Sequence, residues 1–136
     1  MAMNWKEIAE QYPKAFRLLY RGLMYSGWDA DESDEAIAED LAYTGLSIHD
    51  LFEQEYLVAH EDSPWNWRNL YDFFDGKGIY VEVFNHKDYI KFGYSIRYHI
   101  SGITWGGDAA IMLFDTRVEA EEAAFVKTFE ILEAHL

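Results

Sequence analysis

The residues of this chain that are best able to do chemistry are acidic, and they are concentrated in one segment. From position 29 to position 62 there is no Lys or Arg, and the carboxylates are Asp29, Asp31, Glu32, Asp34, Glu35, Glu39, Asp40, Asp50, Glu53, Glu55, Glu61 and Asp62. Clustered carboxylates attract basic surfaces over long distances and raise the rate of association with them. The segment therefore predicts a docking surface for a basic protein partner. The alternative is a solvated face that only keeps the protein in solution.

The cations of the chain are too few to neutralise this segment. The chain holds 25 acidic and 11 basic residues, a formal net charge of −14. Even if Lys6, Lys14, Arg17 and Arg21 all paired with the segment, most of its charge would stay unbalanced. Repulsion between like charges costs stability, which gives a purely structural surface little reason to keep them. The same acidity disfavours nucleic acid as a direct partner, because phosphate contacts need clustered Lys and Arg.

Two tryptophans are candidate apolar anchors for such an interface. Trp28 directly precedes the acidic run, and Trp65 falls on the polar side of its predicted helix. Trp is enriched among the residues that dominate binding energy. The predicted partner-binding residues are Trp28, Asp29, Asp31, Glu32, Glu35, Glu39, Asp40 and Trp65. The alternative for each ring is packing beneath a neighbouring loop.

Patterns for metals and phosphates are incomplete. Residues 29–33 begin like an EF-hand calcium loop, but Asp34 stands where that loop needs Gly. The five His residues lack metal-ligand spacing, and residues 76–78 lack the other parts of a P-loop. We therefore expect no metal and no cofactor.

Catalysis has one weak candidate, Glu55, which lies within a predicted apolar helix face. A buried carboxylate can serve as a general acid, but it needs a second polar group that the sequence does not identify. We therefore expect a protein that is not an enzyme. One alternative is a ligand-binding or enzymatic pocket that contains Glu55 and is lined by Tyr94, Tyr98 and Trp105. Another is a structural or assembly subunit.

Helical periodicity and start signals occupy the first half of the chain and its end. Ser33 is predicted to cap the helix that carries the acids, and Thr116 with Glu119 forms an S/T-x-x-E capping box. The predicted helices begin at Asn4, run over 13–25 and from 34 to about 43, begin at Ser47 and at Ser63-Pro64, and run from 116 to about 135.

Between these helices the apolar period changes from 3.6 to 2, which is typical of strands. Residues 79–84 and 89–100 are predicted to form the first two strands. Residues 109–114 are continuously apolar, so this third strand is expected to be buried on both faces, at the sheet centre or beneath a helix. Helices, then strands, then a helix predict an α+β fold. We expect one domain over residues 1–136, with a three-stranded antiparallel meander and the C-terminal helix packed on the sheet.

Composition sets the expected location and class. The chain has no Cys, and its longest apolar run, Ala109 to Phe114, is far short of the roughly 20 residues of a membrane helix. We expect a cytoplasmic protein without membrane contact. Small size, acidity and the lack of catalytic motifs are also typical of phage-encoded inhibitors, immunity proteins and antitoxins, a likeness of composition that transfers no residue. The sequence thus predicts a non-enzymatic acidic binding protein of inhibitor, immunity or anti-defence type, and leaves its partner and oligomeric state open.

Overall fold

A computed structural model describes residues 3–57, 68–85, 91–100 and 104–136. The chain forms two compact units, which are described separately. The first unit contains α1 (Trp5–Gln11), α2 (Pro13–Met24), α3 (Ala30–Thr44), α4 (Ile48–Leu51) and a π-helical segment, η1 (Phe52–Leu57). The second contains α5 (Arg68–Gly76), β1 (Ile79–Asn85), β2 (Phe92–Ile100), β3 (Thr104–Phe114) and α6 (Arg117–Ala134). A single domain over residues 1–136 stays a prediction, because two compact units can still unfold as one.

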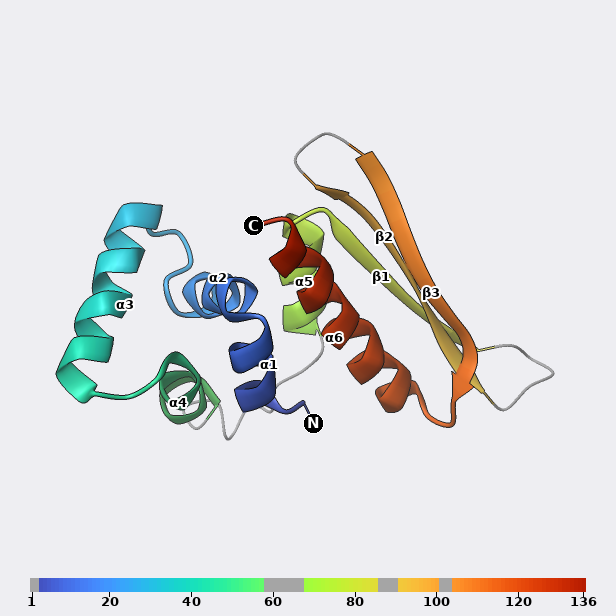
Figure 1. The fold of residues 1–136 in the computed structure, drawn as a ribbon, viewed down its shortest axis with the longest axis horizontal. Coiled ribbons are helices and arrows are strands. Elements are labelled where there is room, and N and C mark those ends of the chain that lie inside the picture. The colour runs from blue at the N-terminus through green and yellow to red at the C-terminus, as the bar shows by residue number, and fades with distance from the viewer. Residues whose placement is uncertain (1–2, 58–67, 86–90, 101–103) are drawn as a thin grey trace. The chain divides into compact units, whose positions relative to one another are not determined.

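The second unit confirms the predicted α+β fold. Its three strands form an antiparallel meander in the order β1-β2-β3, and α5 and α6 lie on the same side of the sheet (Figure 1). The core between them includes Phe74, whose ring centroid lies 5.8 Å from that of Phe125 and 5.0 Å from that of Phe129. All three rings are fully buried, so aromatic packing joins α5 to α6.

The prediction for residues 109–114 is wrong. They belong to β3, which begins at Thr104 and forms an edge of the sheet, while β2 is the central strand. Ile111 is 65% exposed and Leu113 is 69% exposed. Both side chains lie on the face opposite to α5 and α6, because the side chains of a strand alternate between the two faces. A continuous apolar run predicts burial on both faces, but among the described helices α5 and α6 pack on one face of the sheet and none packs on the other.

In the first unit, aromatic rings pack at the junction of three helical segments. The ring of Phe52 lies 5.0 Å from that of Trp5 and 5.4 Å from that of Phe16.

Pro13 occupies the first position of α2, as predicted, where its missing N–H costs no helical hydrogen bond. Gly45, with φ of 69°, ends α3 in the left-handed conformation that glycine adopts easily. Gly45 thus sets the end of α3, the helix that carries most of the candidate site.

The predicted caps are correct at three helices and wrong at α3. The side chains of Asn4, Ser47 and Thr116 accept the expected backbone N–H groups. At α3 the cap is Asp29, whose Oδ1 accepts the N–H of Asp31 at 2.8 Å. Ser33 instead lies buried within the helix and donates to the carbonyl of Ala30 at 3.0 Å. The helix thus begins one turn earlier than predicted, with Asp31 and Glu32 in its first turn, where the helix dipole stabilises acidic residues.

Replacing Asp29 with Ala is expected to lower the free energy of unfolding by about 1 kcal/mol, because the cap hydrogen bond is lost. Asp29→Asn keeps an accepting oxygen and should unfold close to the wild type. Urea titration followed by circular dichroism measures both. An Asp29→Ala variant as stable as the wild type would show that the cap contributes nothing.

Candidate functional site

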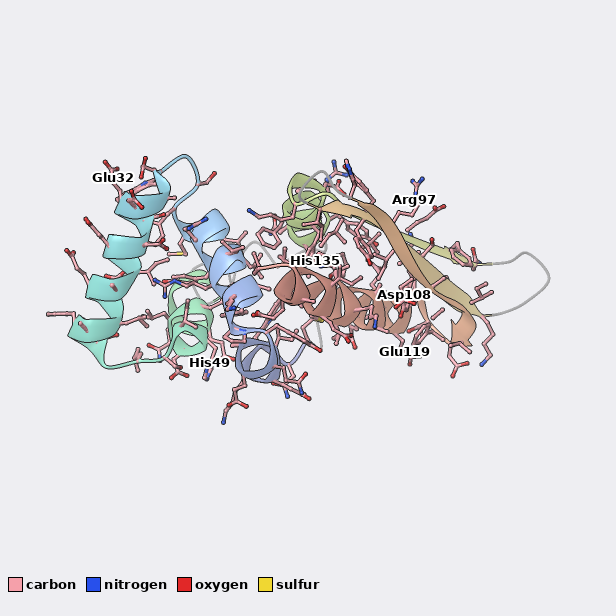
Figure 2. All side chains as sticks on the ribbon, turned by 45° about the horizontal axis from the view of Figure 1, so that its top comes forward. Glu32, His49, Arg97, Asp108, Glu119 and His135 are labelled. Atoms are coloured by element: carbon pink, nitrogen blue, oxygen red, sulfur yellow. The ribbon has the colours of Figure 1, made fainter. Side chains whose placement is uncertain are left out.

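The outward side of α3 carries four carboxylates, which we call the α3 acidic face: Asp31, Glu32, Glu35 and Glu39. All four are exposed and fall within an arc of about 100° on a helix of 3.6 residues per turn. Figure 2 shows Glu32 on the side of α3 that points away from α2. Among the described residues, no cation forms an ion pair with any of the four. Their charge is therefore displayed to solvent without compensation from the described chain.

The two remaining carboxylates of α3 each have a defined partner, in α2 or directly after it. Asp34 lies 3.4 Å from Nη1 of Arg21 and 3.8 Å from Nε of Arg17. Asp40, one of the predicted partner-binding residues, accepts a hydrogen bond from the Tyr25 hydroxyl at 2.7 Å. Both carboxylates are partly buried. They hold α3 against α2, and two of the three basic residues of α2 are engaged in doing so.

Aromatic side chains stand at both ends of the α3 acidic face. Trp28 is 55% exposed, and its ring meets that of Tyr25 edge-on at 5.1 Å. Tyr43 is 93% exposed and lies four residues after Glu39, so it continues the same helical row. The predicted site does not include Tyr43, because a tyrosine near a helix end is as compatible with burial as with exposure. Its spacing of four from Glu39 and eight from Glu35 is the signal that would have found it.

Several predicted site residues are not placed. Trp65 lies outside the described residues, and so do the side chains of Glu55 and Trp105. Of the residues expected to line a ligand cavity, Tyr94 is buried in the sheet and Tyr98 packs against the His135 ring at 5.6 Å. A cavity that contains Glu55 stays a prediction.

The first unit has a pocket that the sequence did not predict. It has a volume of about 420 Å³ and lies where α2 begins, α3 ends and α4 begins, with Pro13, Lys14, Arg17, Leu41, Leu46, Ser47 and Ile48 as its lining. These residues come from three separate stretches of the chain. No local pattern announces such a pocket, because only the packing of the three helices brings its walls together.

The second unit contains a partly buried polar cluster between α5 and α6. The Tyr71 hydroxyl donates to Oε2 of Glu121 at 3.2 Å, and Nε of Arg117 lies 3.7 Å from Oε1 of the same carboxylate. Burial raises the pKa of Tyr71 to about 12, and the neighbouring charge of Glu121 adds to the effect. A phenol that keeps its proton so firmly is a poor general acid or base near neutral pH. The cluster therefore links the two helices.

The raised pKa of Tyr71 predicts a loss of stability in alkali. An unfolded tyrosine loses its proton near pH 10, whereas the folded one does so near pH 12. The contribution is present in full below pH 10 and falls as pH rises to 12, by about 1 kcal/mol in free energy of unfolding, because solvent reaches the half-buried hydroxyl and screens its interactions. Tyr71→Phe should unfold with a correspondingly weaker dependence on pH over this range. Urea unfolding of both proteins at pH 9 and pH 11.5 measures the difference, and equal slopes would contradict it.

Two further properties concern the described part of the chain alone. No three of its His, Asp and Glu side chains gather closely enough to hold a metal ion. Within the same segments, no helix is both long and apolar enough to cross a membrane.

Comparison with known protein families, curated proteins and solved structures gave no match. The fold and the surface together define an α+β protein with an acidic helix face. Its function is approached through the residues of that face.

Proposed function

We propose that this protein is a non-enzymatic binding protein that docks on a basic surface of a protein partner, as an inhibitor, immunity or anti-defence protein does. The contact surface is the α3 acidic face, with Trp28 and Asp29 at its start and Tyr43 at its end. The observation that carries the proposal is a contrast within one helix. Asp34 pairs with Arg21 on α2 and Asp40 with Tyr25, the residue that follows α2, whereas none of the four outward carboxylates forms an ion pair with a described residue.

Like charges on this face repel one another. Asp31 and Glu35, and Glu35 and Glu39, are spaced by four residues, where like-charge pairs destabilise a helix by roughly 0.2–0.5 kcal/mol each. Arg17 and Arg21 do not relieve the repulsion, since both are directed at Asp34. Lys and Arg side chains of a partner would relieve it on binding. The same field would speed the encounter.

The aromatic residues of this surface supply binding affinity that its charges alone do not. Contacts made by exposed carboxylates raise the association rate and fix the orientation of the partner more than they raise affinity. Trp and Tyr, in contrast, dominate the binding energy of protein interfaces. Trp28 and Tyr43 stand near the two ends of α3, whose 15 residues span about 22 Å. That length fits one side of an interface of ordinary size.

The partner is expected to be a protein, because the acidic face repels phosphate. The chain contains no Cys and so requires no oxidising compartment. A cytoplasmic location is part of the proposal.

The proposal is tested by the salt dependence of binding. The full-length protein captures partners from native lysate at low salt, and the recovered partner is purified for measurement of Kd. Between about 50 and 500 mM salt, Kd is expected to weaken about 100-fold, because the Debye length falls well below 10 Å. Binding that does not change with salt contradicts a contact made through the α3 acidic face.

A further inference from the structure

The pocket of the first unit has an apolar wall on three segments. Leu41 lies near the end of α3, Leu46 follows it, and Ile48 opens α4. Ser47 also lines the pocket, but its Oγ donates to Oδ2 of Asp50 at 2.7 Å and accepts the Asp50 N–H. This wall can therefore pack against the hydrocarbon part of a ligand. Its volume of about 420 Å³ lies within the range of small-molecule sites.

The opposite wall is basic. Lys14 is exposed, and none of the described residues forms an ion pair or a hydrogen bond with its ammonium group. Arg17 reaches Asp34 only through Nε, at the long distance of 3.8 Å, and it shares that carboxylate with Arg21. Lys14 and Arg17 thus form the basic wall at the start of α2, and Asp34, the carboxylate that Arg17 contacts, also pairs with Arg21. On a protein with a formal net charge of −14, this is a local positive field beside an apolar wall.

We propose that this pocket binds a small apolar monocarboxylate. The alkyl or aryl tail lies against Leu41, Leu46 and Ile48, and the carboxylate is held by Lys14 and Arg17. An apolar ligand without a charge would leave the two cations unused, and an apolar cation would be repelled by them. A small inorganic anion would leave the apolar wall exposed to water.

This site is distinct from the surface of the proposed function. Leu41 lies outside the arc of the α3 acidic face, about 120° around α3 from Glu35, since it is six residues from Glu35 on a helix of 3.6 residues per turn. The pocket is therefore tested with the partner absent. Its failure would leave the salt dependence of partner binding unaffected.

The probe is 4-phenylbutyrate, and its neutral isostere is 4-phenylbutyramide. Nuclear magnetic resonance titration of the full-length protein is expected to show saturable binding of the carboxylate with Kd of about 0.1–1 mM, as the size of the ligand implies. Shifts should centre on the residues around Leu41, Leu46 and Ile48. The amide should bind about 10-fold more weakly, because it lacks the charge that Lys14 and Arg17 recognise.

Two variants test the assignment of residues. Lys14→Gln should weaken 4-phenylbutyrate about 5-fold to 10-fold without changing the affinity for the amide. Lys6→Gln is the matched control, since it removes the same charge from an exposed lysine on α1 that does not line the pocket. It should leave the affinity unchanged. Leu46→Trp fills the pocket and should abolish binding.

Three results would overturn the proposal. They are no saturable binding of 4-phenylbutyrate, equal affinity for its amide, and shifts that centre away from the α2, α3 and α4 residues of the pocket. The last result is read on the wild-type protein, so it decides the matter even if Leu46→Trp fails to fold.

Discussion

Neutralising the α3 acidic face is expected to weaken partner binding about 100-fold at low salt. The variant replaces Asp31 with Asn and Glu32, Glu35 and Glu39 with Gln. Exposed ion pairs contribute about 0.2–1 kcal/mol each, so four of them contribute about 0.8–4 kcal/mol, a range that includes the 2.7 kcal/mol of a factor of about 100 in Kd. The loss should fall mainly on the association rate. At 500 mM salt the variant and the wild type should differ by less than about 5-fold, because the charges are then screened.

The stability of the protein should change in the opposite direction. Replacing only Glu35 and Glu39 removes like-charge repulsion without touching the first turn, where acids are stabilised by the helix dipole. The free energy of unfolding is expected to rise by about 0.5–1 kcal/mol, while binding weakens. A surface selected only for the fold would not keep charges that lower its stability. Thermal unfolding together with measured Kd values gives both quantities for the same variant.

The control for the four-residue α3 variant has the same net charge as that variant but leaves the α3 acidic face intact. It replaces four exposed acids elsewhere for which no described residue is an ion-pair partner, as Glu10→Gln, Glu53→Gln, Asp75→Asn and Glu82→Gln. Its Kd should stay within about 3-fold of the wild type at each salt concentration. If the control weakens binding as much as the α3 variant, net charge governs the interaction and the docking surface is not on α3.

Phe74→Ala is expected to lower the free energy of unfolding by about 3–5 kcal/mol. Phe74 is fully buried and packs against both Phe125 and Phe129, so its removal leaves a cavity between α5 and α6. For a chain of this size the melting temperature should fall by about 10–15 °C. Phe74→Leu keeps most of the volume and should lose only about 1.5 kcal/mol. Equal stability of the Ala and Leu variants would show that this site collapses without cost.

The same variant tests whether the chain is one cooperative domain. Phe16→Ala makes a comparable deletion in the first unit, where Phe16 packs against Trp5 and Phe52. If residues 1–136 unfold as one domain, each variant lowers the protection of amide hydrogens in both units. Hydrogen exchange measured on peptides from α2 and from β2 reports each unit separately. Protection that falls only in the mutated unit would contradict a single domain.

Local signals predicted most of the fold because they act within a few residues. Asn4, Ser47 and Thr116 cap their helices through N–H groups three residues away, and Gly45 ends α3 through its own backbone conformation. The alternation in β2 likewise follows from strand geometry. Such features depend on sequence spacing alone, so they were predictable without knowledge of the neighbouring elements.

The predictions from sequence were wrong where two local signals competed, and where the packing of a neighbouring element determined the burial of a strand. Asp29 and Ser33 are both good caps, and the helix began at the one that places Asp31 and Glu32 in its first turn. The apolar run in β3 is equally consistent with a central strand and with an edge strand. The strand order β1-β2-β3 makes β3 an edge strand. The burial of its two faces depends instead on where helices pack, and among the described residues α5 and α6 cover one face of the sheet.

For the candidate site, the sequence by itself determined that a long acidic stretch lacks cations and that most of it is helical. Only the tertiary structure decided which carboxylates are displayed. The packing of α3 on α2 turned Asp34 and Asp40 toward Arg21 and Tyr25 and left the α3 acidic face and Tyr43 outward. It also brought Lys14 beside Leu41, Leu46 and Ile48. The physical reason is that charge is a property of each residue, whereas exposure and partnership depend on residues distant in the sequence, which meet only when the helices pack.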